Sequence, residues 1–262
     1  MANTELQRFI DGIDSGPTIV FVHGWPDDHT IFDKQVAHLK DRYRCVTTDL
    51  PGFGSEDTSK WGHSFEDITT RLEKTIEAVG NGKPVLLVAH DWGCIMAYML
   101  EKKRPDLVRK LVVLDVGGEV SFRPSFNALS IFMYQSYLNL AFLIGGPIGN
   151  AMARLCSRLG GAEPASSANM ARSSSCYLYF HFWKARLTGA DVGPYTPRCP
   201  VLYLYGTTGC KKLMTFHADC WTDKINNKEG SAAAGVADAG HWPMLDQPDV
   251  VNRRLDAFFA EG

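Results

Sequence analysis

The sequence predicts an α/β protein whose core is a mostly parallel sheet flanked by helices. Short apolar runs that fit strands alternate along the chain with longer helical patterns, as the crossovers of a parallel sheet require. Some of these runs are apolar without interruption, which is typical of strands buried on both faces. With 262 residues, of which 45% are hydrophobic, the chain can also bury one large core.

Individual elements follow from local patterns. Thr18 to Val22 are β-branched or aromatic residues, which favour a strand. Lys83-Pro84 interrupts the preceding helical pattern, and the apolar run from Val85 to Val88 then fits a buried strand. We expect strands near residues 18–23, 43–49, 84–90, 109–116, 199–206 and 234–238. We expect helices near residues 30–41, 64–80, 93–104, 213–224 and 246–260.

A long segment after the fourth predicted strand interrupts this alternation. It contains three aromatic and aliphatic stretches with helical character, which are Ile131–Ile144, Ile148–Leu159 and Tyr177–Leu187. Gly145-Gly146-Pro147 separates the first two, and small polar residues separate the last two. We therefore expect a core made of residues 1–118 and 196–262 and a helical insertion made of residues 119–195.

An aspartate occupies the turn between a predicted strand and the helix after it, in the sequence Ala89-His90-Asp91-Trp92-Gly93. This pattern resembles the nucleophile elbow of the α/β-hydrolase superfamily, G-x-Nuc-x-G, with Ala89 in place of the first glycine. Such a turn exposes the side chain at its tip and points the N-terminus of the following helix at it, which favours an anion. The alternative is that Asp91 only caps the helix N-terminus.

Two further segments resemble loops of the same superfamily. His23-Gly24-Trp25-Pro26 resembles the HGxP loop, which supplies a backbone N–H to the oxyanion hole. The resemblance therefore assigns the N–H groups of Trp25 and Trp92 to that hole. Ala239-Gly240-His241-Trp242-Pro243 resembles the loop of the catalytic histidine, which assigns His241 as the base.

The third member of a catalytic triad is assigned to Asp115. The turn from Gly206 to Cys210, where these enzymes often carry the acid, contains none. Asp115 ends the strand after the elbow helix, a second location that the family uses. An unpaired carboxylate would be costly there, so Asp115 needs a partner such as an imidazolium. Two alternatives are that Asp115 only caps the following loop, and that Asp238, three residues before His241, is the acid.

Together these segments resemble the aspartate-nucleophile branch of the superfamily, which contains epoxide hydrolases and haloalkane and fluoroacetate dehalogenases. The resemblance implies that Asp91 attacks a saturated carbon and forms an alkyl ester, which water activated by His241 then hydrolyses. The chemistry of a carboxylate agrees, because it is ionised at pH 7 without the help of a base. An epoxide hydrolase acting on a small apolar substrate is the first expectation, and a haloalkane-type dehalogenase is the second.

The leaving group should depend on the insertion, which corresponds to the cap domain of the family. Epoxide hydrolases protonate the ring oxygen with two cap tyrosines. By position, Tyr134 or Tyr137 fits the first of them, and Tyr179 or Tyr177 fits the second. The second tyrosine of the family commonly precedes a basic residue, and that place here holds Trp183, whose indole could bind a halide. Each tyrosine could instead be a core residue with a satisfied hydroxyl.

Other functions remain open on the same fold. Haloalkane dehalogenases carry an asparagine in the HGxP loop, where this chain has Trp25, and fluoroacetate dehalogenases carry arginines around the elbow, where it has Trp92 and Ile95. A cofactorless dioxygenase resembles the chain in the HGW loop but usually has serine at the elbow. A non-catalytic homologue that binds a small molecule is the remaining alternative.

Composition restricts the partners and the compartment. The net charge of −2 gives no reason to expect nucleic acid or a membrane as a partner, and no apolar run has the length of a membrane span or the form of a signal peptide. The seven cysteines are scattered without C-x-x-C spacing, which favours free thiols in a cytoplasmic protein over disulfides or a metal site. No cofactor motif occurs, so the expected partners are a small apolar substrate and water, and both a monomer and a homodimer stay open.

Overall fold

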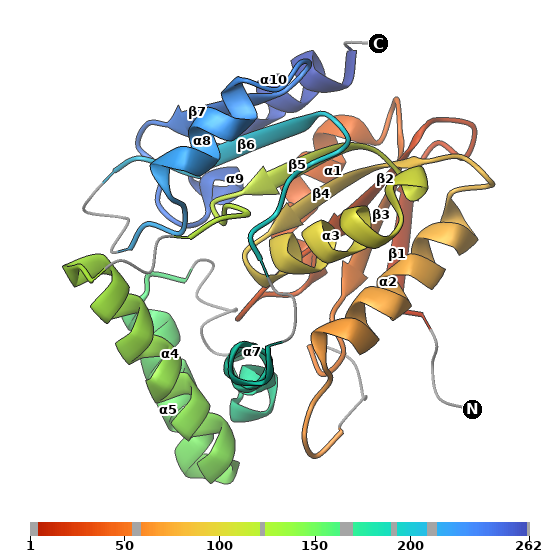
Figure 1. Ribbon diagram of the computed structural model, residues 1–262. Helices are drawn as coiled ribbons and strands as arrows, with labels where there is room; N and C mark the ends of the chain where they lie inside the picture. Colours follow the sequence, from red (N-terminus) through yellow and green to blue (C-terminus); the bar gives the residue numbers. More distant parts are fainter. Residues whose placement is uncertain are drawn as a thin grey trace.

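In the computed structural model, the described residues form a seven-stranded sheet at the centre of the molecule (Figure 1). The structure describes residues 5–53, 59–120, 124–162, 170–189, 193–208 and 214–260. The strand order is β1-β3-β2-β4-β5-β6-β7, and every pair of neighbours is parallel except β1 with β3. The strands are β1 Gln7–Gly12, β2 Thr18–Val22, β3 Arg44–Asp49, β4 Val85–His90, β5 Val108–Leu114, β6 Val201–Gly206 and β7 Ala232–Val236. The predicted mostly parallel sheet is confirmed.

Helices cover both faces of the sheet and enclose two apolar cores. Successive side chains of a strand point to opposite faces. In β2, Val20 and Val22 therefore belong to the core that α2, α3 and α8 cover, whereas Ile19 and Phe21 belong to the core that α1 and α10 cover. The helices of this layered core are α1 Asp33–Leu39, α2 Phe65–Val79, α3 Trp92–Lys103, α8 Asp219–Asn226, α9 Pro243–Asp246 and α10 Pro248–Ala260.

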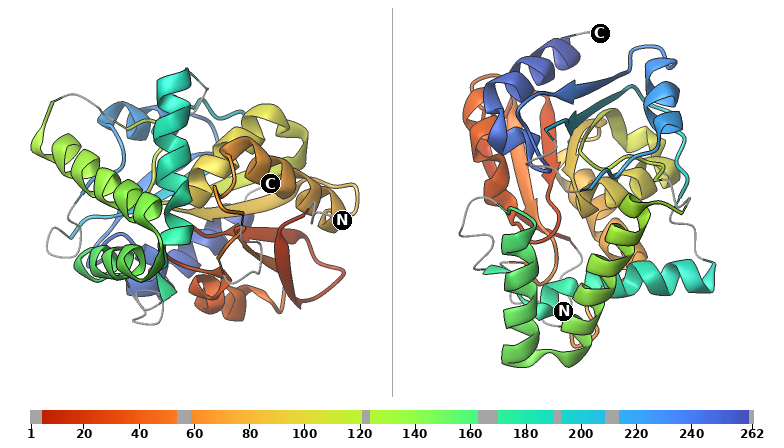
Figure 2. Two further views of the ribbon diagram at one scale, coloured as in Figure 1. Left: turned by 90° about the horizontal axis from the view of Figure 1, so that it is seen from below. Right: turned by 90° about the vertical axis from the view of Figure 1, so that its left-hand side faces the viewer.

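Three helices from the predicted insertion lie together at one end of the molecule, away from the C-terminus (Figure 2). They are α4 Phe126–Ile144, α5 Gly146–Leu159 and α7 Tyr177–Thr188. Gly145, with a φ of 64°, joins α4 to α5 in a helical hairpin. The hairpin is tight because a Cβ at Gly149 would collide with the carbonyl oxygen of Ala141. Among the described residues, none of the helices combines the length and the apolar character needed to cross a bilayer.

Strand β1 was not predicted from the sequence. It is exposed along its whole length, so it lacks the alternation of apolar and polar residues that marks a half-buried strand. It pairs antiparallel with β3 at the edge of the sheet, from Gln7 opposite Asp49 to Gly12 opposite Arg44. Backbone pairing and the stacking of the Phe9 ring on His29 therefore hold this strand.

The predicted helix at 213–224 was wrong at its start, because α8 begins only at Asp219. In the residues before it, Phe216 forms a bridge with Val116, and the Ala218 N–H donates to the carbonyl of Glu119 at 2.8 Å. These contacts use backbone groups that a helix would need. Smaller shifts occur elsewhere: β7 starts two residues earlier than expected, and the predicted helix at 30–41 is divided into the short helix His29–Phe32 and α1. The predicted helix at 246–260 corresponds to α10, which begins at Pro248, and the short helix α9 precedes it.

Candidate active site

Asp91 lies at a sharp turn between β4 and α3. Its backbone has a φ of 51° and a ψ of −122°, a strained conformation for a residue with a side chain. Glycines make room for this turn, because a Cβ at Gly24 would collide with the Asp91 carboxylate and one at Gly93 with the carbonyl oxygen of Val22. Asp91 occupies the N-cap position of α3, but its side chain makes no capping hydrogen bond. The alternative that Asp91 only caps the helix is therefore wrong.

Backbone N–H groups hold the carboxylate of Asp91. The Trp25 N–H donates to Asp91 Oδ1 at 2.8 Å, and a bond from the Trp92 N–H favours the ionised carboxylate as well. The Trp25 loop is tied to the end of β3 by His23, whose Nε2 accepts from the Leu50 N–H at 3.0 Å. Burial lowers the pKa of His23, so the neutral ring that this bond requires is favoured. The loop that holds Oδ1 is thus itself anchored to the end of β3.

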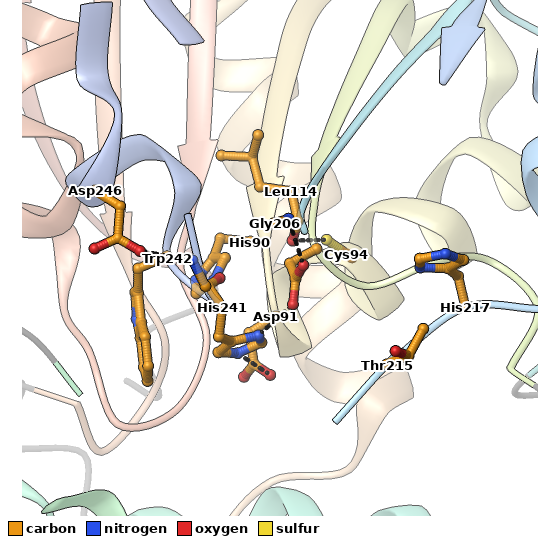
Figure 3. A network of polar contacts seen from close by, with 12 residues as sticks. His90, Asp91, Cys94, Leu114, Gly206, Thr215, His217, His241, Trp242 and Asp246 are labelled. Carbon is orange, nitrogen blue, oxygen red and sulfur yellow. Dashed lines mark hydrogen bonds and ion pairs between the residues drawn. The ribbon is translucent and has the colours of Figure 1, made fainter. Parts of the chain in front are cut away.

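His241 lies between two carboxylates, and Figure 3 shows its ring directed toward Asp91. Its Nε2 is 3.3 Å from Asp91 Oδ2, and its Nδ1 is 2.8 Å from Asp115 Oδ2. Asp115 is fully buried, and its Oδ1 accepts from the Gly206 N–H at 3.1 Å. Asp115 therefore does more than cap the following loop. Asp238, the alternative acid, is exposed in the turn after β7.

The electrostatics of this group favour an ion pair. Burial lowers the pKa of His241, but hydrogen bonds to Asp115 and Asp91 and the charges of both carboxylates raise it to about 9. Burial raises the pKa of Asp91, but the hydrogen bond and charge of His241 outweigh burial, and the pKa of Asp91 is lowered. At neutral pH the free protein therefore holds an imidazolium beside two carboxylates.

Three residues that the sequence did not mark as functional fix the His241 loop. His90 Nε2–H donates to the carbonyl oxygen of His241 at 2.8 Å, and burial together with the nearby charge of His241 lowers the pKa of His90 to about 4. Asp27 Oδ2 accepts from Trp242 Nε1–H at 2.8 Å, and Asp246 Oδ2 accepts from the backbone N–H before His241 at 2.7 Å. All three lie beside residues of the recognised loops, which is the one signal that could have identified them.

A cavity of about 420 Å³ adjoins Asp91 and His241. Helices α4, α5 and α7 contribute much of its wall. Its lining is mainly apolar or aromatic and includes Met133, Leu155, Leu159, Met214, Phe216 and Trp242. A small apolar molecule therefore fits the chemistry of this cavity.

Three of the four candidate tyrosines line the cavity, namely Tyr134, Tyr137 and Tyr179. The rings of Tyr134 and Tyr179 meet edge to face, with centroids 5.8 Å apart. Burial raises the pKa of both phenols, and the negative charge of Asp91 raises it further. Tyr134 Oη also accepts from Gln135 Nε2 at 3.3 Å. Both phenols thus stay protonated beside the carboxylate.

Tyr177 and Trp183 do not line this cavity. Tyr177 is buried away from it, where its hydroxyl donates to the carbonyl oxygen of Pro51 at 2.8 Å. The ring of Trp183 packs edge to face against Phe132 and Phe182, with centroids 5.5 Å and 5.8 Å away. The expectation that Tyr177 or Trp183 contacts the leaving group is therefore wrong, because each side chain is used in packing.

The described residues contain no group of three or more His, Cys, Asp or Glu side chains that could hold a metal ion. The six cysteines within them are free thiols, and five of the six are buried or partly buried. The side chains with polar groups that line the cavity are Asp91, His241, the three tyrosines, Ser157, Cys156, Trp25 and Trp242.

The chain was compared with known proteins. Residues 19–254 match the model of the alpha/beta hydrolase family. Epoxide hydrolase 1 of Caenorhabditis elegans is 24% identical over 274 aligned residues, which cover 94% of this chain and 66% of the relative. A haloalkane dehalogenase of Mesorhizobium japonicum is 32% identical over 107 residues, which cover 41% of this chain and 34% of that protein. The chain thus spans just under two thirds of the length of the first relative.

A solved structure shares the fold of this chain. The Bacillus megaterium epoxide hydrolase in complex with an inhibitor superposes with a TM-score of 0.75 at 18% identity, over 98% of this chain and 97% of the other. A family match over most of the sequence, a shared fold and the strained aspartate turn all agree. The chain belongs to the α/β-hydrolase family.

Proposed function

We propose that this protein is an epoxide hydrolase that acts on small apolar epoxides through a covalent ester on Asp91. The relatives include an epoxide hydrolase and a haloalkane dehalogenase by name. Both activities need a nucleophile that attacks a saturated carbon. An ionised aspartate suits this task, because the product is a stable alkyl ester.

In the first half-reaction, Asp91 Oδ2 attacks one carbon of the epoxide. A carbon–oxygen bond forms to Oδ2, and the bond between that carbon and the ring oxygen breaks with its electron pair going to oxygen. Tyr134 and Tyr179 donate to this oxygen, and one of them supplies the proton. Asp91 Oδ1 stays in its hydrogen bond with the Trp25 N–H, 2.8 Å away, and becomes the carbonyl oxygen of the ester.

In the second half-reaction, water attacks the ester at the Asp91 carbonyl carbon. His241 Nε2 takes a proton from this water, and Asp115 orients and stabilises the imidazolium. The negative charge that develops on Oδ1 is stabilised by the N–H groups of Trp25 and Trp92. The bond from the carbonyl carbon to Oδ2 then breaks with its electron pair going to Oδ2. This oxygen takes the second proton of the attacking water, so the diol leaves with the original aspartate oxygen and Asp91 is again a carboxylate. The proton that His241 took from water restores the tyrosine that gave its proton to the ring oxygen.

One observation carries the choice of an epoxide. Tyr134 and Tyr179 line the same cavity as Asp91 and His241, from two different helices of the insertion. An epoxide opens to an alkoxide, which needs a proton donor, whereas a halide leaves as a weak base and needs none. Two protonated phenols at the nucleophile therefore favour oxygen as the leaving atom.

The covalent step is tested by a single turnover of a simple aryl epoxide in ¹⁸O-labelled water with enzyme in excess. We expect one ¹⁸O atom in the tryptic peptide that contains Asp91, and none in the diol. Enzyme incubated without epoxide is the control. Label in the diol with an unlabelled Asp91 peptide would mean that water attacks the epoxide directly, and this result would overturn the mechanism.

The proton donors are tested by conservative variants. Tyr134→Phe and Tyr179→Phe should each lower the rate of ester formation by ~10²-fold, the scale of general acid catalysis. Tyr177→Phe is the matched control, because its hydroxyl bonds to Pro51 and it lies outside the cavity lining. Stopped-flow or rapid-quench measurement with the epoxide gives the rate. Unchanged ester formation in both cavity variants would end the tyrosine assignment.

A haloalkane dehalogenase is the second candidate, and one observation favours it. The indole Nε1–H of Trp92 is buried and makes no hydrogen bond of normal geometry with the part of the chain that the structure describes. Such a donor beside Asp91 could hold a departing halide. Turnover of a bromoalkane should then be lost in Trp92→Phe and kept in Tyr134→Phe, which is the opposite of the pattern expected for an epoxide.

A further inference from the structure

A second, smaller cavity adjoins Asp91. Its volume is about 60 Å³, against about 420 Å³ for the cavity described above. Asp91, Tyr134 and Phe216 line both cavities, so a molecule held at the nucleophile borders both spaces. Much of the wall of the smaller cavity is apolar and is formed by Ile95, Val116, Val120, Ile131 and Phe182. A substrate at Asp91 can therefore extend one substituent into each cavity.

Gln135 gives the smaller cavity a buried hydrogen-bond acceptor. It lines the smaller cavity and not the larger one, and only 7% of the residue is exposed. Its Nε2 donates to Tyr134 Oη at 3.3 Å. Its Oε1 is buried and accepts no hydrogen bond from the residues that the structure describes. A buried carbonyl oxygen without a donor is costly, so this one indicates a ligand group that donates to it.

The hydrogen bond to Tyr134 fixes the orientation of this amide. If Oε1 faced Tyr134, the phenol would donate its proton to the amide rather than to the ring oxygen of an epoxide. With Nε2–H donating to Tyr134 Oη, the phenol proton stays available to the substrate, and Oε1 is the end of the amide that does not face Tyr134. This orientation rests on the proposed role of Tyr134.

We propose that the substrates are epoxides with two unequal arms, and that the short arm ends in a hydroxyl group that donates to Gln135 Oε1. The larger cavity, with its mainly apolar lining, takes the long apolar arm. A cavity of about 10–15 Å³ holds one water molecule, so about 60 Å³ accommodates a hydroxymethyl group but not a long chain. The apolar wall favours a neutral donor over a charged one. This substrate class rests on the proposed epoxide hydrolysis.

Two epoxides that differ by one oxygen atom test the assignment. Both carry a pentyl group on one ring carbon, and the other ring carbon carries a hydroxymethyl group in the first and a methyl group in the second. The ratio of their kcat/KM values in the wild type should exceed the ratio in Gln135→Leu by about tenfold, the scale of one hydrogen bond to a buried acceptor. Loss of the bond to Tyr134 should slow Gln135→Leu with both epoxides, so it cancels in the ratio. Equal ratios in the two proteins would overturn the proposal.

Ser157→Ala is the matched control. Ser157 is also buried, and its hydroxyl has no partner among the described residues, but it lines only the larger cavity. Its replacement should leave the ratio at the wild-type value. A ratio that falls in Ser157→Ala and not in Gln135→Leu would put the hydroxyl arm in the larger cavity, contrary to the proposal.

The length of the short arm is tested by an epoxide with a pentyl group on both ring carbons. The wild type should turn it over at least about tenfold more slowly than the epoxide with one pentyl and one methyl group, because the smaller cavity must be overpacked to admit a second pentyl group. Ile131→Ala should recover part of this turnover, whereas Leu155→Ala, which enlarges only the larger cavity, should not. Similar turnover of both epoxides by the wild type would contradict the short arm.

Binding of unreactive analogues separates the role of Gln135 from the epoxide activity. Cyclopropanes with the same two pairs of arms keep the shape of the ring, and Asp91 cannot open them. In calorimetric titrations the wild type should bind the hydroxymethyl cyclopropane more tightly than the methyl one, and Gln135→Leu and Gln135→Met should both reduce this preference by about tenfold. Tighter binding of the methyl analogue to the wild type would rule out the hydroxyl site, even if neither variant folds. Failure to hydrolyse any epoxide, with the binding preference intact, would instead contradict the proposed function alone.

Discussion

At the scale of single residues, the two oxygens of Asp91 have different surroundings. Oδ1 accepts the Trp25 N–H at 2.8 Å, whereas Oδ2 lies 3.3 Å from His241 Nε2. In the proposed mechanism, Oδ1 would therefore become the carbonyl oxygen of the ester, and Oδ2 would attack the substrate. The imidazole of His241 would then lie beside the ester and beside the water that hydrolyses it.

His241→Gln should separate the two half-reactions. An ionised carboxylate attacks without a base, so this variant should form the ester and fail to hydrolyse it. Intact-protein mass spectrometry after mixing with epoxide should show the mass of enzyme plus substrate, and Asp91→Ala should never show it. A His241→Gln protein that stays at its own mass while the wild type turns over would mean that the base acts earlier.

The pH dependence follows from the pKa of about 9 for His241 in the free protein. Ester formation removes the charge of Asp91, one of the groups that raise this pKa. The pKa of His241 should therefore fall in the ester intermediate, while the bond to Asp115 remains. The neutral imidazole is the base, so ester hydrolysis should rise with pH through an apparent pKa below 9. Rapid-quench measurement of the ester against pH tests this sign, and a hydrolysis rate that falls as pH rises would contradict it.

Short motifs in the sequence assigned Asp91 and His241, and the end of a predicted strand assigned Asp115; the structure brings these three side chains together. The tyrosines could not be resolved in this way. Tyr177 and Tyr179 are two residues apart on α7, so their side chains point to nearly opposite sides, and one reaches the cavity while the other reaches Pro51. Which side faces the nucleophile depends on how α7 packs, and this packing is tertiary information.

At the scale of elements, the cavity depends on how closely α4 and α5 approach. Gly149 on α5 faces the carbonyl oxygen of Ala141 on α4 and the side chain of Ser173. Met133 and Leu155 line the cavity from the same two helices. A change in the spacing of this hairpin should therefore affect both stability and the shape of the cavity.

Gly149→Ala tests this spacing. The added methyl group must push α5 away from Ala141, and overpacking of this kind costs about 1–3 kcal/mol in the free energy of unfolding. Urea denaturation measures the loss. Gly160→Ala is the matched control, since its nearest neighbour would be 3.3 Å from the new Cβ and the helix already ends there. Equal stability of Gly149→Ala and the wild type would show that the hairpin adapts freely.

The sequence predicted the buried strands well because burial on both faces leaves a continuous apolar run, as in β4. The prediction from the sequence failed where backbone hydrogen bonds, rather than buried side chains, hold a segment in place. Strand β1 is exposed throughout, and the segment before α8 is held by its bridge to Val116 and by a bond from Ala218 to the carbonyl of Glu119. Neither leaves a pattern in the side chains.

At the scale of the whole molecule, the chain leaves the core after β5 and returns before β6. The segment that leaves the core contacts the segment that returns to it, because the Tyr195 N–H donates to the carbonyl oxygen of Gly118 at 3.0 Å. The elbow helix α3 takes part in this junction through Glu101, which is completely buried. Helix α3, which follows Asp91, is thus bonded to the segment that carries the chain back from the insertion.

Glu101→Ala should show how strongly this junction holds the molecule together. The carboxylate accepts from the Tyr195 hydroxyl at 2.7 Å and from the backbone N–H groups of Arg198 and Cys199 at 2.8 Å each. Its removal leaves two buried donors and one partly buried donor without their acceptor, which should lower the free energy of unfolding by about 3 kcal/mol or more. Glu229→Ala, at an exposed site, is the control and should change it by less than about 0.5 kcal/mol. Urea denaturation compares the free energies of unfolding of the two variants. A similar small decrease in both would mean that packing, rather than the Glu101 carboxylate, holds the two segments of this junction together.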